Sequence, residues 1–167
     1  MHSARLSGNA AAQPSGPVSV VVIAVSTGGP AALAEVVPRL PPGLRQPVLI
    51  VQHMPPVFTR VLAQRLAGSS PLQVREATHQ ERIQGGHVLI APGDHHMRVA
   101  GSAREAWIAL DQGPTENGCR PAADPLFDML RSGARSTLAV WSFGCTGVGG
   151  VAGSSNFSAW EVTDCVS

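Results

Sequence analysis

The stretch from Val18 to Pro30 reads V-S-V-V-V-I-A-V-S-T-G-G-P, and it decides the fold class of this chain. Seven of its first eight residues are apolar. A continuous, largely β-branched run of this length predicts a strand that is buried on both faces. The run ends at Ser26-Thr27-Gly28-Gly29, and apolar residues then recur at helical spacing from Pro30 to Leu40. The stretch therefore predicts a strand, a tight glycine turn and a helix.

The same pattern occurs again downstream. A second short apolar strand is predicted at 47–51, and a helix follows from Phe58 to Leu66, ended by Gly68. The order strand, helix, strand, helix predicts parallel strands joined by right-handed crossovers. Further strands are predicted at 72–75, 87–91 and 137–143, a hairpin at 97–100 and 106–110, and a helix at 124–132. We expect an α/β fold with a doubly wound, mostly parallel sheet, helices on both faces and a small antiparallel hairpin at one edge.

Length and composition set the domain organisation. The chain has 167 residues, of which 44% are hydrophobic and 14% charged, which suits one globular domain with a core of its own. Residues 1–16 are rich in Ala, Ser, Gly and Pro and are predicted to form a flexible tail. The α/β domain is expected at 17–153. Residues 154–167 show no clear period and are expected to form an irregular C-terminal tail.

Charge and cysteine content exclude several function classes. The net charge is +1, so no broad basic face for nucleic acid is expected. The three cysteines lie far apart without a C-x-x-C motif, which argues against a disulfide framework or a zinc site. No apolar run is long enough to span a membrane, so membrane insertion is not expected, and the N-terminal residues lack the apolar core of a signal peptide. We expect a cytoplasmic protein.

Ser26 and His53 are the leading candidates for chemistry. Each follows the end of a predicted strand, and the carboxyl ends of neighbouring parallel strands face one crevice. A serine hydroxyl becomes a useful nucleophile when a base takes its proton, and histidine titrates near neutrality. Two structural interpretations stay open: Ser26 could be the N-cap of the following helix, and His53 could be a loop histidine bonded to the backbone.

Other candidate sites carry weaker signals. Asp94-His95-His96 could suggest a metal, but adjacent histidines in a strand point to opposite faces, so an ordinary turn is favoured. The pair Gly28-Gly29 could cradle a phosphate, but the chain around it lacks G-x-G-x-x-G and the Walker lysine. We expect neither a metal nor a cofactor.

Several ordered motifs resemble one family. The segments A-V-S-T-G-G-P at 24–30 and Q-H-M-P-P at 52–56, the latter followed by Phe58-Thr59, are similar to motifs of the chemotaxis protein-glutamate methylesterases, the CheB family. The segments G-H-V-L-I-A-P-G at 86–93 and N-G-C-R-P at 117–121 resemble further stretches of that family. The resemblance runs from about Val18 to Leu130, and the set of motifs is far more specific than any one of them.

The resemblance implies a doubly wound α/β catalytic domain and a reaction. In that family a serine attacks the γ-methyl ester of modified glutamates on chemoreceptor helices, so Ser26 is expected to be the nucleophile. His53 is expected to take its proton and later to protonate the leaving methanol. Thr27 and Gly28 are expected to lie beside the oxyanion and the substrate. The implied partner is the cytoplasmic domain of a methyl-accepting chemoreceptor, and deamidation of receptor glutamines is an implied second activity.

The C-terminal part departs from the family pattern. The family's third catalytic residue is an aspartate in T-G-M-G-x-D-G, where this chain reads T-G-V-G-G-V-A at 146–152. The aspartate position then holds Val151, which cannot accept an imidazole N–H, and loss of such an aspartate costs a serine protease about 10⁴ in kcat. Asp164 is a weak substitute candidate. An alternative function is therefore a catalytically impaired domain that binds receptors or other partners.

Two further departures are expected to matter less. Relatives commonly carry a receiver domain ahead of the esterase, whereas only the short tail precedes it here, so we expect no receiver in this chain. The altered and shortened C-terminal sequence suggests the hypothesis of a truncated or frame-shifted reading, which the coding DNA in its other frames would test. The family motif N-G-H-R-P also has Cys119 in place of its histidine.

Overall fold

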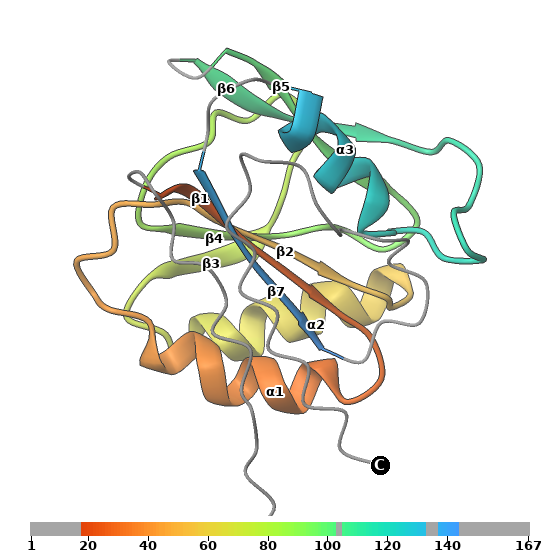
Figure 1. Ribbon diagram of the computed structural model, residues 1–167. Coiled ribbons are helices and arrows are strands. Elements are labelled where there is room, and N and C mark those ends of the chain that lie inside the picture. The colour runs from red at the N-terminus through yellow and green to blue at the C-terminus, as the bar shows by residue number, and fades with distance from the viewer. Residues whose placement is uncertain (1–17, 103–104, 133–136, 144–167) are drawn as a thin grey trace, which may run out of the picture.

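A parallel sheet forms the centre of the molecule (Figure 1). The computed structural model describes residues 18–102, 105–132 and 137–143. Within these residues a five-stranded sheet has the order β3-β4-β2-β1-β7, and every pair in it is parallel. Its strands are β1 (Val18–Val25), β2 (Val48–Gln52), β3 (Gln73–Glu76), β4 (His87–Ile90) and β7 (Thr137–Phe143). The parallel sheet predicted from the apolar runs is confirmed.

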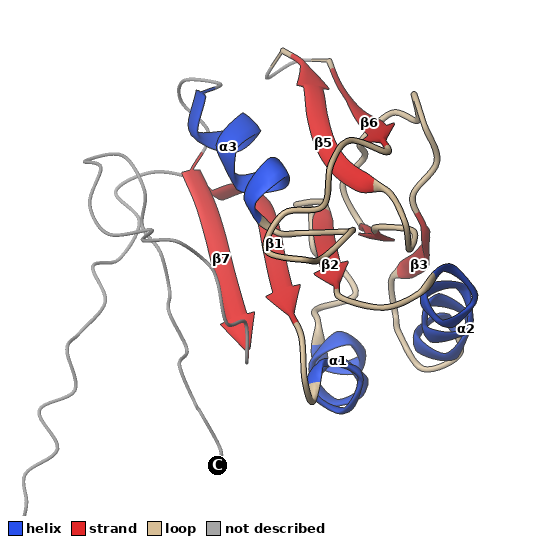
Figure 2. Cartoon of the chain, turned by 90° about the vertical axis from the view of Figure 1, so that its right-hand side faces the viewer, coloured by secondary structure: helices blue, strands red, loops and turns tan. Residues whose placement is uncertain are grey.

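Helices and a hairpin cover the two faces of this sheet (Figure 2). Helices α1 (Gly29–Val36) and α2 (Pro56–Ala67) lie on one face, and a short 3-10 helix at Val37–Arg39 extends α1. Helix α3 (Asp124–Ser132) and a separate two-stranded antiparallel sheet lie on the other face. That small sheet consists of β5 (His96–Gly101) and β6 (Ala106–Asp111). The predicted α/β class, with helices on both faces and a hairpin, is confirmed.

Burial on both faces explains the unbroken apolar run of β1. Its side chains alternate between the two cores, so that Val22 and Ala24 pack under α3 and the hairpin, whereas Ile23 and Val25 pack under α1 and α2. All four of these side chains are fully buried. A strand with this double burial favours apolar residues on both faces, which is why the run from Val20 to Val25 lacks the alternation of a half-exposed strand.

The hairpin lies over a face of the main sheet and does not extend its edge. Met97 of β5 and Ile108 of β6 are buried in the same core as Leu126 of α3. The hydrogen-bond ladder of each hairpin strand pairs it with the other hairpin strand. The apolar residues at these positions therefore pack against a face of the sheet. A sequence pattern alone does not distinguish such a hairpin from strands at the sheet edge.

Loops at the carboxyl ends of β2 and β4 pack closely together. Gly93, just after β4, lies so near the loop after β2 that a Cβ on it would be 2.3 Å from the nitrogen of Pro56. The Gly93 N–H donates to the buried hydroxyl of Thr59 at 3.0 Å. The carboxyl edge of the sheet is therefore a packed group of loops, and α/β folds bind their ligands at this edge. Across the described residues, the helices are too short or too polar to cross a membrane.

Candidate active site

Ser26 and His53 meet at the carboxyl edge of the sheet. Strands β1 and β2 are parallel neighbours whose last residues, Val25 and Gln52, are paired in register. Ser26 and His53 directly follow those residues, and the His53 N–H donates to the Val25 carbonyl at 3.3 Å. The side chains are in hydrogen-bond reach, with 3.2 Å between His53 Nδ1 and Ser26 Oγ. The strand register alone therefore brings together a hydroxyl and an imidazole.

The interpretation of Ser26 as the N-cap of α1 is wrong. The N-cap residue is Gly28, with φ +79°, and no side chain caps this helix end. The Gly28 carbonyl instead accepts from the N–H groups of Ala31 and Ala32, both at 3.1 Å. Glycine reaches this left-handed conformation at little cost. The turn is thus made by its backbone, and the Ser26 hydroxyl is left to His53.

Gln52 is a residue that the sequence reasoning missed. It ends β2, and its side chain is 2% exposed. Its amide nitrogen Nε2 donates to the Ser26 carbonyl at 3.0 Å and to the His53 carbonyl at 3.3 Å. One side chain thus connects the two loops that carry the hydroxyl and the imidazole. A polar residue that ends a fully apolar run was the available signal, but it also looks like an ordinary strand end.

Burial tunes His53 toward its neutral form. Partial removal from water lowers the pKa of His53 below its usual 6.5, and the negative charge of Asp124 opposes that shift in part. Burial disfavours the charged imidazolium, so most of the ring is neutral at pH 7. A neutral Nδ1 that accepts from Ser26 leaves Nε2 with the hydrogen. The imidazole is therefore in the state that a general base requires.

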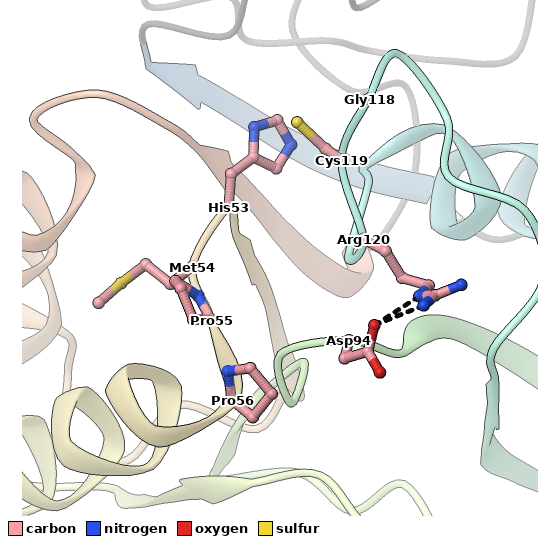
Figure 3. A pocket seen from close by; sticks show the side chains of 8 residues that line it. All are labelled: His53, Met54, Pro55, Pro56, Asp94, Gly118, Cys119 and Arg120. Carbon is pink, nitrogen blue, oxygen red and sulfur yellow. Dashed lines mark hydrogen bonds and ion pairs between the residues drawn. The ribbon is translucent and has the colours of Figure 1, made fainter.

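A pocket opens beside His53 (Figure 3). Its volume is about 580 Å³, within the range of sites for small molecules. One wall is the loop after β2, and the opposite wall is the loop that leads to α3. The Cys119 thiol of that loop points toward the His53 ring. The lining residues are His53, Met54, Pro55, Pro56, Asp94, Gly118, Cys119 and Arg120.

An ion pair fixes the second wall of the pocket. The Arg120 guanidinium lies 2.5 Å from Asp94 Oδ1 through Nη2, and Nε donates to the same oxygen at 2.9 Å. Nη1 donates to the carbonyls of Gln112 and Gly113 at 3.1 and 2.8 Å. Hydrogen bonding to Arg120 holds the pKa of Asp94 below its usual 3.8. The guanidinium thus ties the loop before α3 to the turn after β4.

The adjacent histidines after Asp94 contact the backbone. His96 is buried at the start of β5, where Nε2 donates to the Pro114 carbonyl at 2.9 Å and Nδ1 accepts from the Ala122 N–H at 3.3 Å. His95 Nδ1 lies 3.2 Å from the Gly93 carbonyl. These contacts fit the turn interpretation. Among the described residues, no three potential metal ligands come together.

The remaining predicted site residues divide into two groups. Thr27 and Gly28 are exposed in the turn directly after Ser26. Val151, at the position of the expected aspartate, and the weak candidate Asp164 lie outside the described residues. The described part of the chain therefore contains the Ser26 hydroxyl, the His53 imidazole and the turn after Ser26. Asp124, at the start of α3, is the carboxylate whose charge reaches His53.

Comparisons with known proteins agree on one family. Residues 21–158 match the family model described as CheB methylesterase. A protein-glutamate methylesterase/protein-glutamine glutaminase of Symbiobacterium thermophilum is 49% identical over 132 residues, which are 79% of this chain and 34% of that protein. A second such protein, from Caulobacter vibrioides, is 52% identical over 117 residues, 69% of this chain and 33% of that protein. The chain spans about a third of the length of these curated relatives.

A solved structure shares the fold. The crystal structure of the Thermotoga maritima CheB methylesterase catalytic domain matches with a TM-score of 0.73 at 37% sequence identity. The match covers 79% of this chain and 70% of that chain. The architecture described above is therefore similar to that of a solved catalytic domain.

Proposed function

This chain belongs to the CheB methylesterase family, and on that premise we propose that it is a serine hydrolase acting on glutamate γ-methyl esters of proteins. The observation that carries the proposal is the 3.2 Å separation of Ser26 Oγ and His53 Nδ1 at the carboxyl edge of the sheet. A hydroxyl, a largely neutral imidazole and an adjoining pocket are the parts that acyl transfer through a serine needs.

The first half of the reaction acylates Ser26. His53 Nδ1 accepts the hydroxyl proton while Ser26 Oγ attacks the ester carbonyl carbon. The tetrahedral intermediate collapses as the bond between carbon and methoxy oxygen breaks, and His53 gives its proton to the departing methanol. A glutamyl ester of Ser26 remains. Water then attacks that ester with His53 again as the base, which frees glutamate and restores the hydroxyl.

The turn after Ser26 is the proposed oxyanion site. Within the described residues, the Gly29 N–H donates to the Ser26 carbonyl at 2.9 Å, whereas the N–H groups of Thr27 and Gly28 have no protein acceptor. Backbone N–H groups beside a nucleophile, at a helix N-terminus, can stabilise the negative charge that develops on the carbonyl oxygen. We assign this role to Thr27 and Gly28.

The same chemistry extends to glutamine. An amide at the γ-carbon offers the same carbonyl to Ser26 Oγ, and protonation by His53 then releases ammonia instead of methanol. The matched relatives are named for both activities. The proposed partner is the cytoplasmic domain of a chemoreceptor, whose modified glutamates would enter the pocket beside His53.

Methanol release from a methylated receptor fragment tests this proposal. We expect release by the wild-type protein and at least about a 10³-fold loss in Ser26→Ala, because the nucleophile is gone. A folded wild-type protein that releases no methanol, yet binds the receptor fragment, would favour the impaired binding domain. What favours that second function is the expectation, from the sequence resemblance alone, that Val151 stands where the family has its catalytic aspartate.

A further inference from the structure

We propose that Gln52 is a positioning residue for the reaction, which holds the Ser26 and His53 loops at their working separation. The inference rests on the proposed function of the same site. Gln52 touches neither substrate nor reacting atoms; it acts through the main chain of both site residues. Its Nε2 donates to the Ser26 carbonyl at 3.0 Å and to the His53 carbonyl at 3.3 Å.

The setting of this amide argues for a role at the site. The other four residues of β2 are apolar and at most 1% exposed. Burying an amide in such surroundings costs free energy unless it is hydrogen-bonded. Among the described residues, both hydrogen bonds of the Gln52 side chain go to the two site loops. Because both partners are carbonyl oxygens, an NH₂ group fits between them, whereas a carboxylate would be repelled by both.

The other half of the amide gains nothing for stability. Among the described residues, Gln52 Oε1 is buried without a hydrogen-bond partner. Buried polar atoms without partners are uncommon in folded proteins, and each calls for an explanation. A fold selected for stability alone would do better with an apolar side chain here. The retained amide is explained if its donor is needed to connect Ser26 and His53.

Packing fixes the amide in this orientation. A Cβ on Gly29 would lie 1.9 Å from Gln52 Oε1 and 2.8 Å from the Val25 Cβ. The first residue of α1 therefore presses against the amide, and the absence of a side chain at Gly29 is what makes room for it. A donor held in this way keeps one geometry, and small errors in the placement of reacting groups are costly in rate.

The test replaces Gln52 with methionine, which has similar length and lacks the donor. We expect kcat for methanol release to fall at least about 10-fold, with KM within about twofold, because orientation is lost while the pocket is kept. The midpoint of thermal unfolding is expected to stay or to rise, since the unpaired Oε1 is also removed. Labelling of Ser26 by a serine-directed phosphonate should slow by a similar factor.

Gln73→Met is the matched control. Gln73 is also a sheet glutamine with a side-chain bond, to His87 Nε2 at 2.8 Å, but it lies on β3, away from the site. Its substitution should leave both rates unchanged. Equal rates in Gln52→Met and wild type would overturn the proposal. If Gln52→Met does not fold, Gln52→Glu replaces it, and unchanged kcat per folded molecule in that variant would overturn the proposal in the same way.

The two readouts separate this proposal from the proposed function. A wild-type protein that takes the phosphonate at Ser26 but releases no methanol would contradict the substrate, while the labelling rates would still decide the role of Gln52. Normal methanol release by wild type and by Gln52→Met would contradict Gln52 alone. A folded wild-type protein that shows neither labelling nor release would overturn both.

Discussion

The two walls of the pocket beside His53 are built by different means. We call the loop after β2, which begins with His53, together with the Ser26 turn that is hydrogen-bonded to it, the sheet wall; residues 94 and 118–120 form the loop wall. The sheet wall is set by strand register and by a buried amide. The loop wall is held by the partly exposed pair of Arg120 and Asp94. The comparison suggests that reacting groups need the rigid wall, whereas substrate recognition can use the adjustable one.

The largest effect is expected from removing the base of the sheet wall. His53→Ala leaves Ser26 without a proton acceptor, so kcat should fall about 10⁴-fold. Methanol release per folded molecule is the measurement. His79→Ala is the control, because His79 is exposed and accepts from the Leu110 N–H far from the pocket. A loss in kcat below 10-fold in His53→Ala would show that the sheet wall does not supply the general base.

The next largest effect should follow from filling the space at Gly29. Gly29→Ala places a Cβ against the Gln52 amide and the Val25 side chain. Overpacking of this kind costs about 1–3 kcal/mol of stability, and the shifted amide should lower kcat about 10-fold or more. Thermal unfolding and methanol release measure the two effects.

The control for this change is Gly43→Ala, where a Cβ would meet nothing within 4 Å. It should leave both quantities close to wild type. If Gly29→Ala behaved like Gly43→Ala, the sheet wall would not be the tightly fixed structure that its distances indicate.

A smaller effect, of a different kind, is expected in the loop wall. Arg120→Met removes the charged partner of Asp94, so the loop before α3 should become less ordered and KM should rise several-fold, with kcat within about twofold. Steady-state kinetics separates the two parameters. A fall in kcat with unchanged KM would show that Arg120 supports the reacting groups. The loop wall would then not be specialised for substrate recognition.

The same variant should change how stability depends on pH. Asp94 has a lowered pKa in the folded protein, chiefly because Arg120 hydrogen-bonds its ionised form. Its contribution to stability is therefore present above the unfolded pKa near 3.8 and is lost as the pH falls through the folded pKa. Unfolding by urea should separate wild type from Arg120→Met at neutral pH and less so at strongly acid pH.

The smallest effect is expected from removing the negative charge of Asp124. Asp124 opens α3, accepts from Asn117 Nδ2 at 3.2 Å, and raises the pKa of His53 against the effect of burial. Asp124→Asn removes that charge, so the pKa of His53 should fall further. The acid limb of kcat/KM should then move to lower pH, with little change at pH 8. An unmoved acid limb would show that Asp124 has no influence on the base.

The sheet wall was largely predictable from sequence. The apolar run predicted β1 with the bounds that the structure has, and the paired ends of two parallel strands placed Ser26 next to His53. The N-cap interpretation of Ser26 was wrong because the backbone of Gly28 closes the turn. Gln52 escaped notice because its role depends on two carbonyl positions that a pattern of residue types does not encode.

The loop wall was less predictable. The pairing of Arg120 with Asp94 joins residues 26 positions apart in loops of no regular period. The placement of the hairpin over a sheet face depends on tertiary packing of Met97 and Ile108 under α3. Both features arise from contacts between distant segments, whereas periodicity reports only the local structure of one segment.

Labelling with a serine-directed phosphonate, followed by mass spectrometry, tests the central claim most directly. The claim is that Ser26 and His53 act together as nucleophile and base, and the probe needs no knowledge of the natural substrate. We predict a single adduct on Ser26, absent in Ser26→Ala, slowed at least about 10²-fold in His53→Ala, and half-maximal in rate below pH 6.5 because burial lowers the pKa of His53. A folded protein without an adduct at Ser26, or with an adduct whose rate does not depend on His53, would contradict the account.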